Sequence, residues 1–132
     1  MRITIDTNVL ISAILFPNSP MNEVMKVIAE KHKLLLSSFV IEELLGVVQR
    51  KFTGKKEAVD SFLSKFPFEM VYTPKEMKQG LFQIRDEKDY PVLYTAIIED
   101  VDVLITGDKD FSDIKIEKPE ILTPAQFLEK YC

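Results

Sequence analysis

Short apolar runs alternate with longer amphipathic runs along this sequence, and that alternation constrains the fold more than any other feature. The apolar runs have the length of buried strands, and the stretches between them place apolar residues at helical spacing. Strands that alternate with helices form a parallel sheet covered by helices on both faces. We therefore expect an α/β protein, a three-layer α/β/α sandwich with a central parallel sheet. The strands are expected at residues 3–6, 34–36, 68–72 and 101–105.

Helices are expected in the stretches between and after these strands. They fall around residues 9–14, 20–29, 38–52, 59–66, a short one from 74, then 90–99 and from 124 onward. Ser19 and Ser38 are expected to cap the second and third of them. Thr123 with Gln126 predicts a capping box at the start of the last. The apolar spacing also puts Ala29 and Leu45 on inner helix faces.

The length fits one domain, residues 1–132, with enough chain to bury a core. Residues 1–8 hold no apolar run of the kind that makes a secretory signal. The longest uncharged stretch, residues 7–22, is interrupted by Asn8, Pro17 and Asn18, which argues against a membrane-spanning helix. We therefore expect a cytoplasmic protein.

Two residue counts limit the chemistry that this chain can perform. Cys132 is the single cysteine and His32 the single histidine. One thiol forms neither an intramolecular disulfide nor a cysteine metal site, and one histidine argues against His-rich metal sites. The net charge of −4 argues mildly against a protein that coats nucleic acid through bulk positive charge. Catalysis, if there is any, must depend on carboxylates.

Four acidic residues that lie far apart in the sequence are expected to meet at one edge of the sheet. Asp6 ends the first strand, Glu43 lies about one turn into the helix after the second, and Asp108 follows the strand at 101–105. Asp89 begins a helix antiparallel to that strand, so it starts at the same edge. Ligand sites in such sheets lie beyond the carboxyl ends of the strands.

Such a cluster of carboxylates predicts a metal site. Carboxylates within a few ångströms of one another repel and raise one another's pKa values. Hard divalent cations relieve that repulsion, and a site with only oxygen ligands suits Mg²⁺ or Mn²⁺. These ions activate water and stabilise charge on a phosphodiester, which makes a phosphodiester the natural substrate.

At these residues the sequence resembles the PIN domain family. The resemblance covers nearly the whole chain and lies in four segments. They are IDTNVLISAI at 5–14, SSFVIEEL at 37–44, RDEKDYPVLYTAI at 85–97 and LITGDKDF at 104–111. The subgroup that the chain is most similar to contains the VapC-like toxins of toxin–antitoxin systems. The resemblance implies a flavodoxin-like α/β/α sandwich and Mg²⁺- or Mn²⁺-dependent endoribonuclease activity. It also implies a homodimer or higher oligomer, and a small antitoxin protein that covers the active site.

Carried over residue by residue, the resemblance assigns roles to eight positions. Its metal-binding and catalytic acids match Asp6, Glu43, Asp89 and Asp108, its polar supports match Asn8 and Thr106, and its outer members match Asp86 and Asp110. Two assignments rest on a choice between neighbours. Glu43 is preferred to Glu42 by its distance from Ser37. Asp89 is preferred to Asp86 and Glu87 because it lies seven residues before Ala96 on the inner face of the helix.

Two other functions are considered beside the metal-dependent ribonuclease. The first is a catalytically silent PIN scaffold that binds RNA or protein. The second is a phosphoaspartate receiver, which needs an acceptor aspartate after the third strand and a lysine after the fifth. The sequence shows neither, nor does it hold a Gly-rich phosphate loop. The ribonuclease remains the leading hypothesis.

Overall fold

The protein was studied as a computed structural model, which describes residues 1–16, 20–111 and 113–132. The expected helix cap at Ser19 lies outside the described residues. Within these described ranges, five strands form one sheet in which every neighbouring pair is parallel. The strands are β1 (Arg2–Ile5), β2 (Lys33–Ser37), β3 (Glu69–Val71), β4 (Val103–Ile105) and β5 (Glu120–Leu122).

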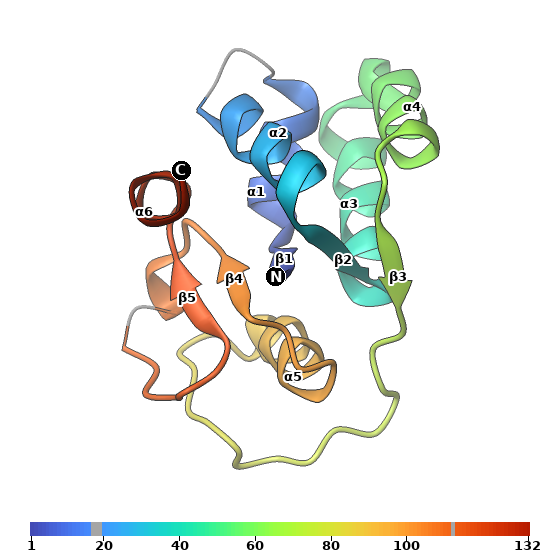
Figure 1. Ribbon diagram of the computed structural model, residues 1–132. Helices are drawn as coiled ribbons and strands as arrows, with labels where there is room; N and C mark the ends of the chain where they lie inside the picture. The colour runs from blue at the N-terminus through green and yellow to red at the C-terminus, as the bar shows by residue number, and fades with distance from the viewer. Residues whose placement is uncertain (17–19, 112) are drawn as a thin grey trace.

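Helices connect the strands and cover both faces of the sheet. The α-helices are α1 (Thr7–Leu15), α2 (Met21–Lys31), α3 (Ser38–Lys51), α4 (Lys56–Lys65), α5 (Tyr90–Ile98) and α6 (Pro124–Tyr131). The described residues also form the 3₁₀ helices η1 (Thr53–Lys55), η2 (Glu87–Asp89) and η3 (Lys109–Phe111). Figure 1 shows α1 to α4 on one side of the sheet and α5 on the other. The expected α/β/α sandwich with a central parallel sheet is therefore confirmed.

The strand order β3-β2-β1-β4-β5 determines where a site can form. It keeps the layers and the parallel sheet of a flavodoxin-like sandwich, although flavodoxin itself has the order 2-1-3-4-5. From β1 the chain moves through β2 to β3 on one side and then returns to β4 on the other, as the long connection in Figure 1 shows. The direction of winding therefore reverses between β1 and β4, and ligands bind at the carboxyl ends of strands at such a reversal.

The core forms because the central strands are buried on both faces. Ile3 and Ile5 of β1 and Leu104 and Ile105 of β4 have no exposed surface, and Thr4 of β1 is buried as well. A strand with helices on both sides has no solvent face, which explains why β4 does not alternate with polar residues. No helix within the described ranges is long and apolar enough to cross a bilayer.

Two of the helix predictions need correction. No helix starts at Pro74, because residues 72–86 form an irregular connection. The backbone N–H of Lys78 donates to the Tyr94 hydroxyl at 3.1 Å, and its carbonyl accepts from the Tyr90 hydroxyl. These contacts replace helical hydrogen bonds. The cap of α3 is Ser37, whose hydroxyl accepts from the Val40 N–H, whereas the Ser38 hydroxyl accepts from the Thr73 N–H.

Two predicted inner residues lie at the surface. Leu45 is 45% exposed, because α3 buries the stripe of Val40, Leu44 and Val48 instead. Ala29 is exposed, and Val27 is buried on α2. Strand β5 was not predicted, since its three residues are too few and too partly exposed to give a pattern. The capping box of α6, between Thr123 and Gln126, is confirmed.

Candidate active site

Asp6 lies at the centre of the acidic edge, between the end of β1 and the start of α1. Its carboxylate accepts hydrogen bonds from the Val9 N–H at 2.9 Å and from the Thr106 hydroxyl. The residue is only 7% exposed. Burial raises the pKa of the Asp6 carboxyl above its ordinary value, and the charges of Asp108 and Glu43 raise it further, against the effect of the two hydrogen bonds. Asp6 is thus both the cap of α1 and a member of an acidic group.

Thr106 joins Asp6 to Asp108. This buried threonine follows β4, and its hydroxyl donates to Asp6 and accepts from the backbone N–H of Asp108 at 3.0 Å. The Asp108 carboxylate in turn accepts from the Asp110 N–H at 2.8 Å. One line of hydrogen bonds therefore fixes three of the acids relative to one another.

Glu43 approaches Asp6 from α3. It is half-buried, whereas its neighbour Glu42 is exposed. The Thr7 hydroxyl donates to the Glu43 carboxylate, and Thr7 is itself buried. Thr7 had no role in the sequence-based prediction, although a polar side chain in an otherwise apolar run was a signal for one. We call Asp6, Glu43 and Asp108 the strand side of the site, since each follows a central strand directly or within two turns.

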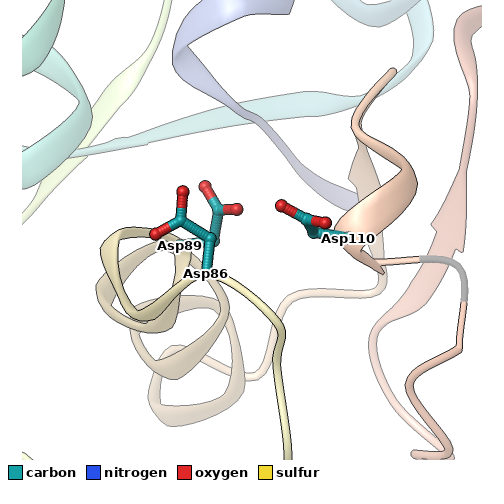
Figure 2. Close-up of side chains that lie close together, drawn as sticks. All are labelled: Asp86, Asp89 and Asp110. Atoms are coloured by element: carbon teal, nitrogen blue, oxygen red, sulfur yellow. The ribbon is translucent and has the colours of Figure 1, made fainter.

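A second group of acids faces the strand side, with two members on the turn before α5 and one on η3. Figure 2 shows Asp86 and Asp89 on that turn, and Asp110 on the segment after β4 pointing toward them. One carboxylate oxygen from each of the three residues lies within 4.8 Å of the others. Among the described residues this is the one group of three potential ligands with that spacing. We call Asp86, Asp89 and Asp110 the turn side of the site.

Asp89 is the acid on this side whose buried carboxylate oxygen, Oδ2, lacks a hydrogen-bond donor among the described residues. The nearby carboxylates of Asp108, Asp86 and Asp110 have no proton to offer it when ionised. Burial, followed by the charges of Asp108 and Asp86, raises the pKa of Asp89 to about 7. Although Asp89 precedes α5, its side chain makes no capping hydrogen bond, so helix capping does not explain this acid.

The irregular segment 72–86 is attached to α5 by aromatic side chains. Phe82 stacks on Tyr90 at 4.4 Å between ring centroids, and Tyr90 stacks on Tyr94 at 5.8 Å. The two tyrosine hydroxyls hold the backbone of Lys78. Arg85 forms an ion pair with Asp113, which ties the end of the segment to the chain beyond η3. These contacts set the place of Asp86 in the turn side, and the sequence pattern gave no indication of them.

The site suits a hard divalent cation. All of its potential ligands are carboxylate oxygens, and they lie at the carboxyl edge of β1 and β4. A buried carboxylate oxygen without a donor, as in Asp89, is the kind of atom that a cation would satisfy. The donor set therefore fits Mg²⁺ or Mn²⁺.

The eight residues singled out from the sequence are placed as follows. Asp6, Glu43 and Asp108 interact electrostatically, and so do Asp89, Asp86, Asp108 and Asp110, so that Asp108 belongs to both groups. Thr106 lies between Asp6 and Asp108. Asn8 lies at the edge of the site, exposed on the first turn of α1, where it lines a cavity together with Asp108.

The fold and the site thus describe an α/β protein with carboxylates at the point where the winding of its parallel sheet reverses. A model of the PIN domain matches residues 2–110, and the chain belongs to the PIN domain family. The resemblance inferred from the motifs is therefore confirmed.

Two similar proteins extend over nearly the whole chain. The chain is 26% identical over 145 residues to the uncharacterized protein MJ1680 of Methanocaldococcus jannaschii, covering 99% of this chain and 92% of that protein. A chain in the crystal structure of VapBC2 from Rickettsia felis, bound to a DNA fragment from their promoter, is similar in fold. That match has a TM-score of 0.70 at 23% identity and covers 92% of this chain and 97% of the other.

Proposed function

We propose that this protein is a metal-dependent endoribonuclease that hydrolyses RNA phosphodiesters. The observation that carries the proposal is the carboxylate trio of Asp86, Asp89 and Asp110, in which a buried oxygen of Asp89 has no donor. In this PIN domain the trio lies near Asp108, which in turn lies near Asp6. Helix capping alone would not require so many acids in one place.

Each acid has a distinct part in the proposed site. Asp6, Glu43, Asp89 and Asp108 would hold the cation, with Asp86 and Asp110 as further ligands on the turn side. Bound Mg²⁺ or Mn²⁺ supplies Lewis acidity toward water and toward the phosphodiester oxygens. Thr106 orients Asp6 and Asp108, and Thr7 orients Glu43, each through its hydroxyl. The acids alone repel phosphate, so RNA binding at this edge requires that their charge be neutralised.

Cleavage of a labelled single-stranded RNA by the purified protein, with and without Mg²⁺ or Mn²⁺, tests the proposal. The Asp6→Asn variant is the matched inactive form. Asparagine caps a helix as well as aspartate does, so the cap of α1 is retained while the charge is lost. We expect metal-dependent cleavage by the wild type and none by the variant. Binding without cleavage would support the silent scaffold, and equal cleavage by both proteins would refute the site.

We also propose that the protein is the toxin of a toxin–antitoxin pair. Support comes from the family and from the fold that it shares with a chain of the VapBC2 complex. The expected partner is a small antitoxin, and the expected assembly is a homodimer or higher oligomer. Induced expression should stop bacterial growth with the wild type and not with Asp6→Asn. Light scattering of the purified protein measures the assembly, and a monomeric mass would refute that part.

A further inference from the structure

We propose that a cavity beside the acidic site binds a nucleobase of the RNA strand, next to the phosphodiester that is cleaved. The cavity measures about 310 Å³, and the described residues that line it are Asn8, Val9, Ser12, Met21, Gly107, Asp108 and Pro124. Its connection to cleavage rests on the proposed function. Asp108 belongs both to this cavity and to the acidic site, so a nucleotide held at the acids can extend its base into the cavity.

Other cavities fit this role less well. Three larger ones, of about 470, 480 and 410 Å³, are lined by none of the eight candidate site residues. A smaller one of about 230 Å³ shares Gly107 and Asp108 with the 310 Å³ cavity. Its Gln126 side chain is engaged in the capping box of α6, where it accepts from the Thr123 N–H at 2.9 Å. Of these five cavities, the 310 Å³ cavity best combines contact with an acid of the site and side chains, Asn8 and Ser12, that make no hydrogen bond among the described residues.

The polar groups of the cavity come from one face of α1. Asn8 and Ser12 are four residues apart and therefore lie one above the other on the helix. Between them, Val9, Leu10 and Ile11 are buried. Neither the Asn8 amide nor the Ser12 hydroxyl has a hydrogen-bond partner within the part of the chain that the structure describes. Both groups are thus available to a ligand in the cavity.

The lining matches a base better than a phosphate. Val9 and Met21 are buried apolar residues and Pro124 is half-buried, so these walls can contact the flat face of a ring. The carboxamide of asparagine offers a donor and an acceptor side by side, the arrangement that pairs with base edges. A base is neutral and is not repelled by Asp108, whereas a phosphate is. Single-stranded RNA presents unstacked bases to pockets of this kind.

Binding of the base is tested without metal or cleavage. The ¹⁵N-labelled protein is titrated with adenosine, cytidine, guanosine and uridine, with ribose as the control ligand, while the Asn8 side-chain amide and the Gly107 amide are followed by NMR. We expect a saturable shift with at least one nucleoside and none with ribose. Asn8→Ala and Ser12→Val should each weaken that binding by roughly tenfold. Asn22→Ala is the matched control, since Asn22 is an exposed asparagine of α2 that does not line the cavity.

A shift with ribose as large as the shift with the nucleosides would overturn the inference. The same nucleoside affinity in both cavity variants as in Asn22→Ala would overturn it as well. Spectra with native dispersion establish that each variant is folded.

Sequencing of the products from a random single-stranded RNA connects the cavity to cleavage. We expect the wild type to prefer certain bases at one fixed position beside the cut, and Ser12→Val, which lies outside the acidic site, to lose that preference. Cleavage by Ser12→Val with an unchanged base profile would overturn the inference and leave the ribonuclease proposal intact. No cleavage by the wild type would instead refute the ribonuclease proposal, and the nucleoside titration then decides on the cavity alone.

Discussion

The strand side and the turn side of the acidic site are built in different ways. On the strand side, Asp6 is buried and accepts two hydrogen bonds from groups fixed by the sheet and by α1. On the turn side, Asp86 is exposed, Asp89 and Asp110 are partly exposed, and an oxygen of Asp89 has no donor among the described residues. The strand side is therefore part of the folded framework, whereas the turn side holds charge that the protein alone does not balance.

This difference gives the two sides different expected dependence on a cation. A carboxylate that accepts fixed hydrogen bonds keeps its position without metal. Carboxylates that face one another without donors gain more from a bound cation, because the cation removes their mutual repulsion. We expect substitutions on the turn side to change the response to metal most, and substitutions on the strand side to change stability most.

The largest expected effect is on catalysis, for Asp89→Asn. We expect RNA cleavage to fall on the order of 100-fold or more, because even outer partners of metal ligands contribute 10- to 100-fold. The folded state without metal should become more stable, since one repelling charge is removed. Cleavage rates and urea unfolding measure the two effects. Glu87→Gln, an exposed neighbour in the same turn, is the control. Cleavage by Asp89→Asn at the rate of Glu87→Gln would show that the turn side is not part of the active site.

The second prediction concerns the cation itself. At a concentration about 100 times its Kd, Mg²⁺ or Mn²⁺ should stabilise the fold by about 2.7 kcal/mol. That corresponds to a rise in Tm on the order of 5–10 °C. Asp86→Asn and Asp110→Asn should each reduce this rise, because they remove members of the carboxylate trio. Calorimetry with and without metal measures the rise in Tm. A rise in both variants as large as in the wild type would mean that the cation binds elsewhere.

The third prediction concerns the strand side. Thr106→Val keeps the shape of the side chain but removes the hydroxyl that links Asp6 to the Asp108 backbone. A buried carboxylate oxygen and a backbone N–H then lose their partner, and we expect a loss of about 1–3 kcal/mol in the free energy of unfolding. Thr53→Val, at an exposed threonine of η1, should change it by less than about 0.5 kcal/mol. Equal urea midpoints for the two variants would contradict the structural role of the strand side.

The sequence predicted the strand side better than the turn side, because the strand side depends on the sheet and the turn side on irregular segments. Asp6 and Asp108 follow runs that were predicted as strands and that lie at the centre of the sheet, so the topology brought them together. The proximity of Asp86 and Asp110 to Asp89 depends on η2, on η3 and on the irregular segment 72–86. Their conformations come from distant contacts, such as the tyrosine hydroxyls on Lys78, which leave no periodic pattern.

The same limit applied to the fold. The central strands and long helices were predictable, because burial imposes a period of apolar residues over many positions. Strand β5 has only three residues, all partly exposed, and it pairs with β4 at an edge of the sheet. A helix was wrongly expected at Pro74, because proline followed by charged residues fits a helix start as well as an irregular segment.

The fourth prediction is a pH dependence of the metal-free protein, smaller than the effect of Thr106→Val because Asp89 is partly exposed. The pKa of Asp89 is about 7 in the folded protein and has an ordinary value of 3.8. Between these values the folded state binds more protons than the unfolded state, so stability should fall as the pH rises from about 4 to 7. Asp89→Asn should make that part of the Tm profile less steep than in Glu87→Gln, with a remaining slope from Asp6, whose pKa is also raised. A slope as steep in Asp89→Asn as in Glu87→Gln would assign the proton to another group.

The smallest expected effect is on the free energy of unfolding, for the ion pair that links the segment before the turn side to the chain beyond η3. Arg85 and Asp113 form an ion pair between side chains that are 64% and 67% exposed. Exposed pairs of this kind contribute at most about 1 kcal/mol, because water and salt screen them. A double-mutant cycle of Arg85→Gln and Asp113→Asn, measured by urea unfolding at low and high salt, should give a coupling energy below that limit that decreases with salt. A coupling as large as the loss in Thr106→Val would mean that the turn side is held as firmly as the strand side. The contrast between a fixed framework and a metal-dependent turn would then no longer hold.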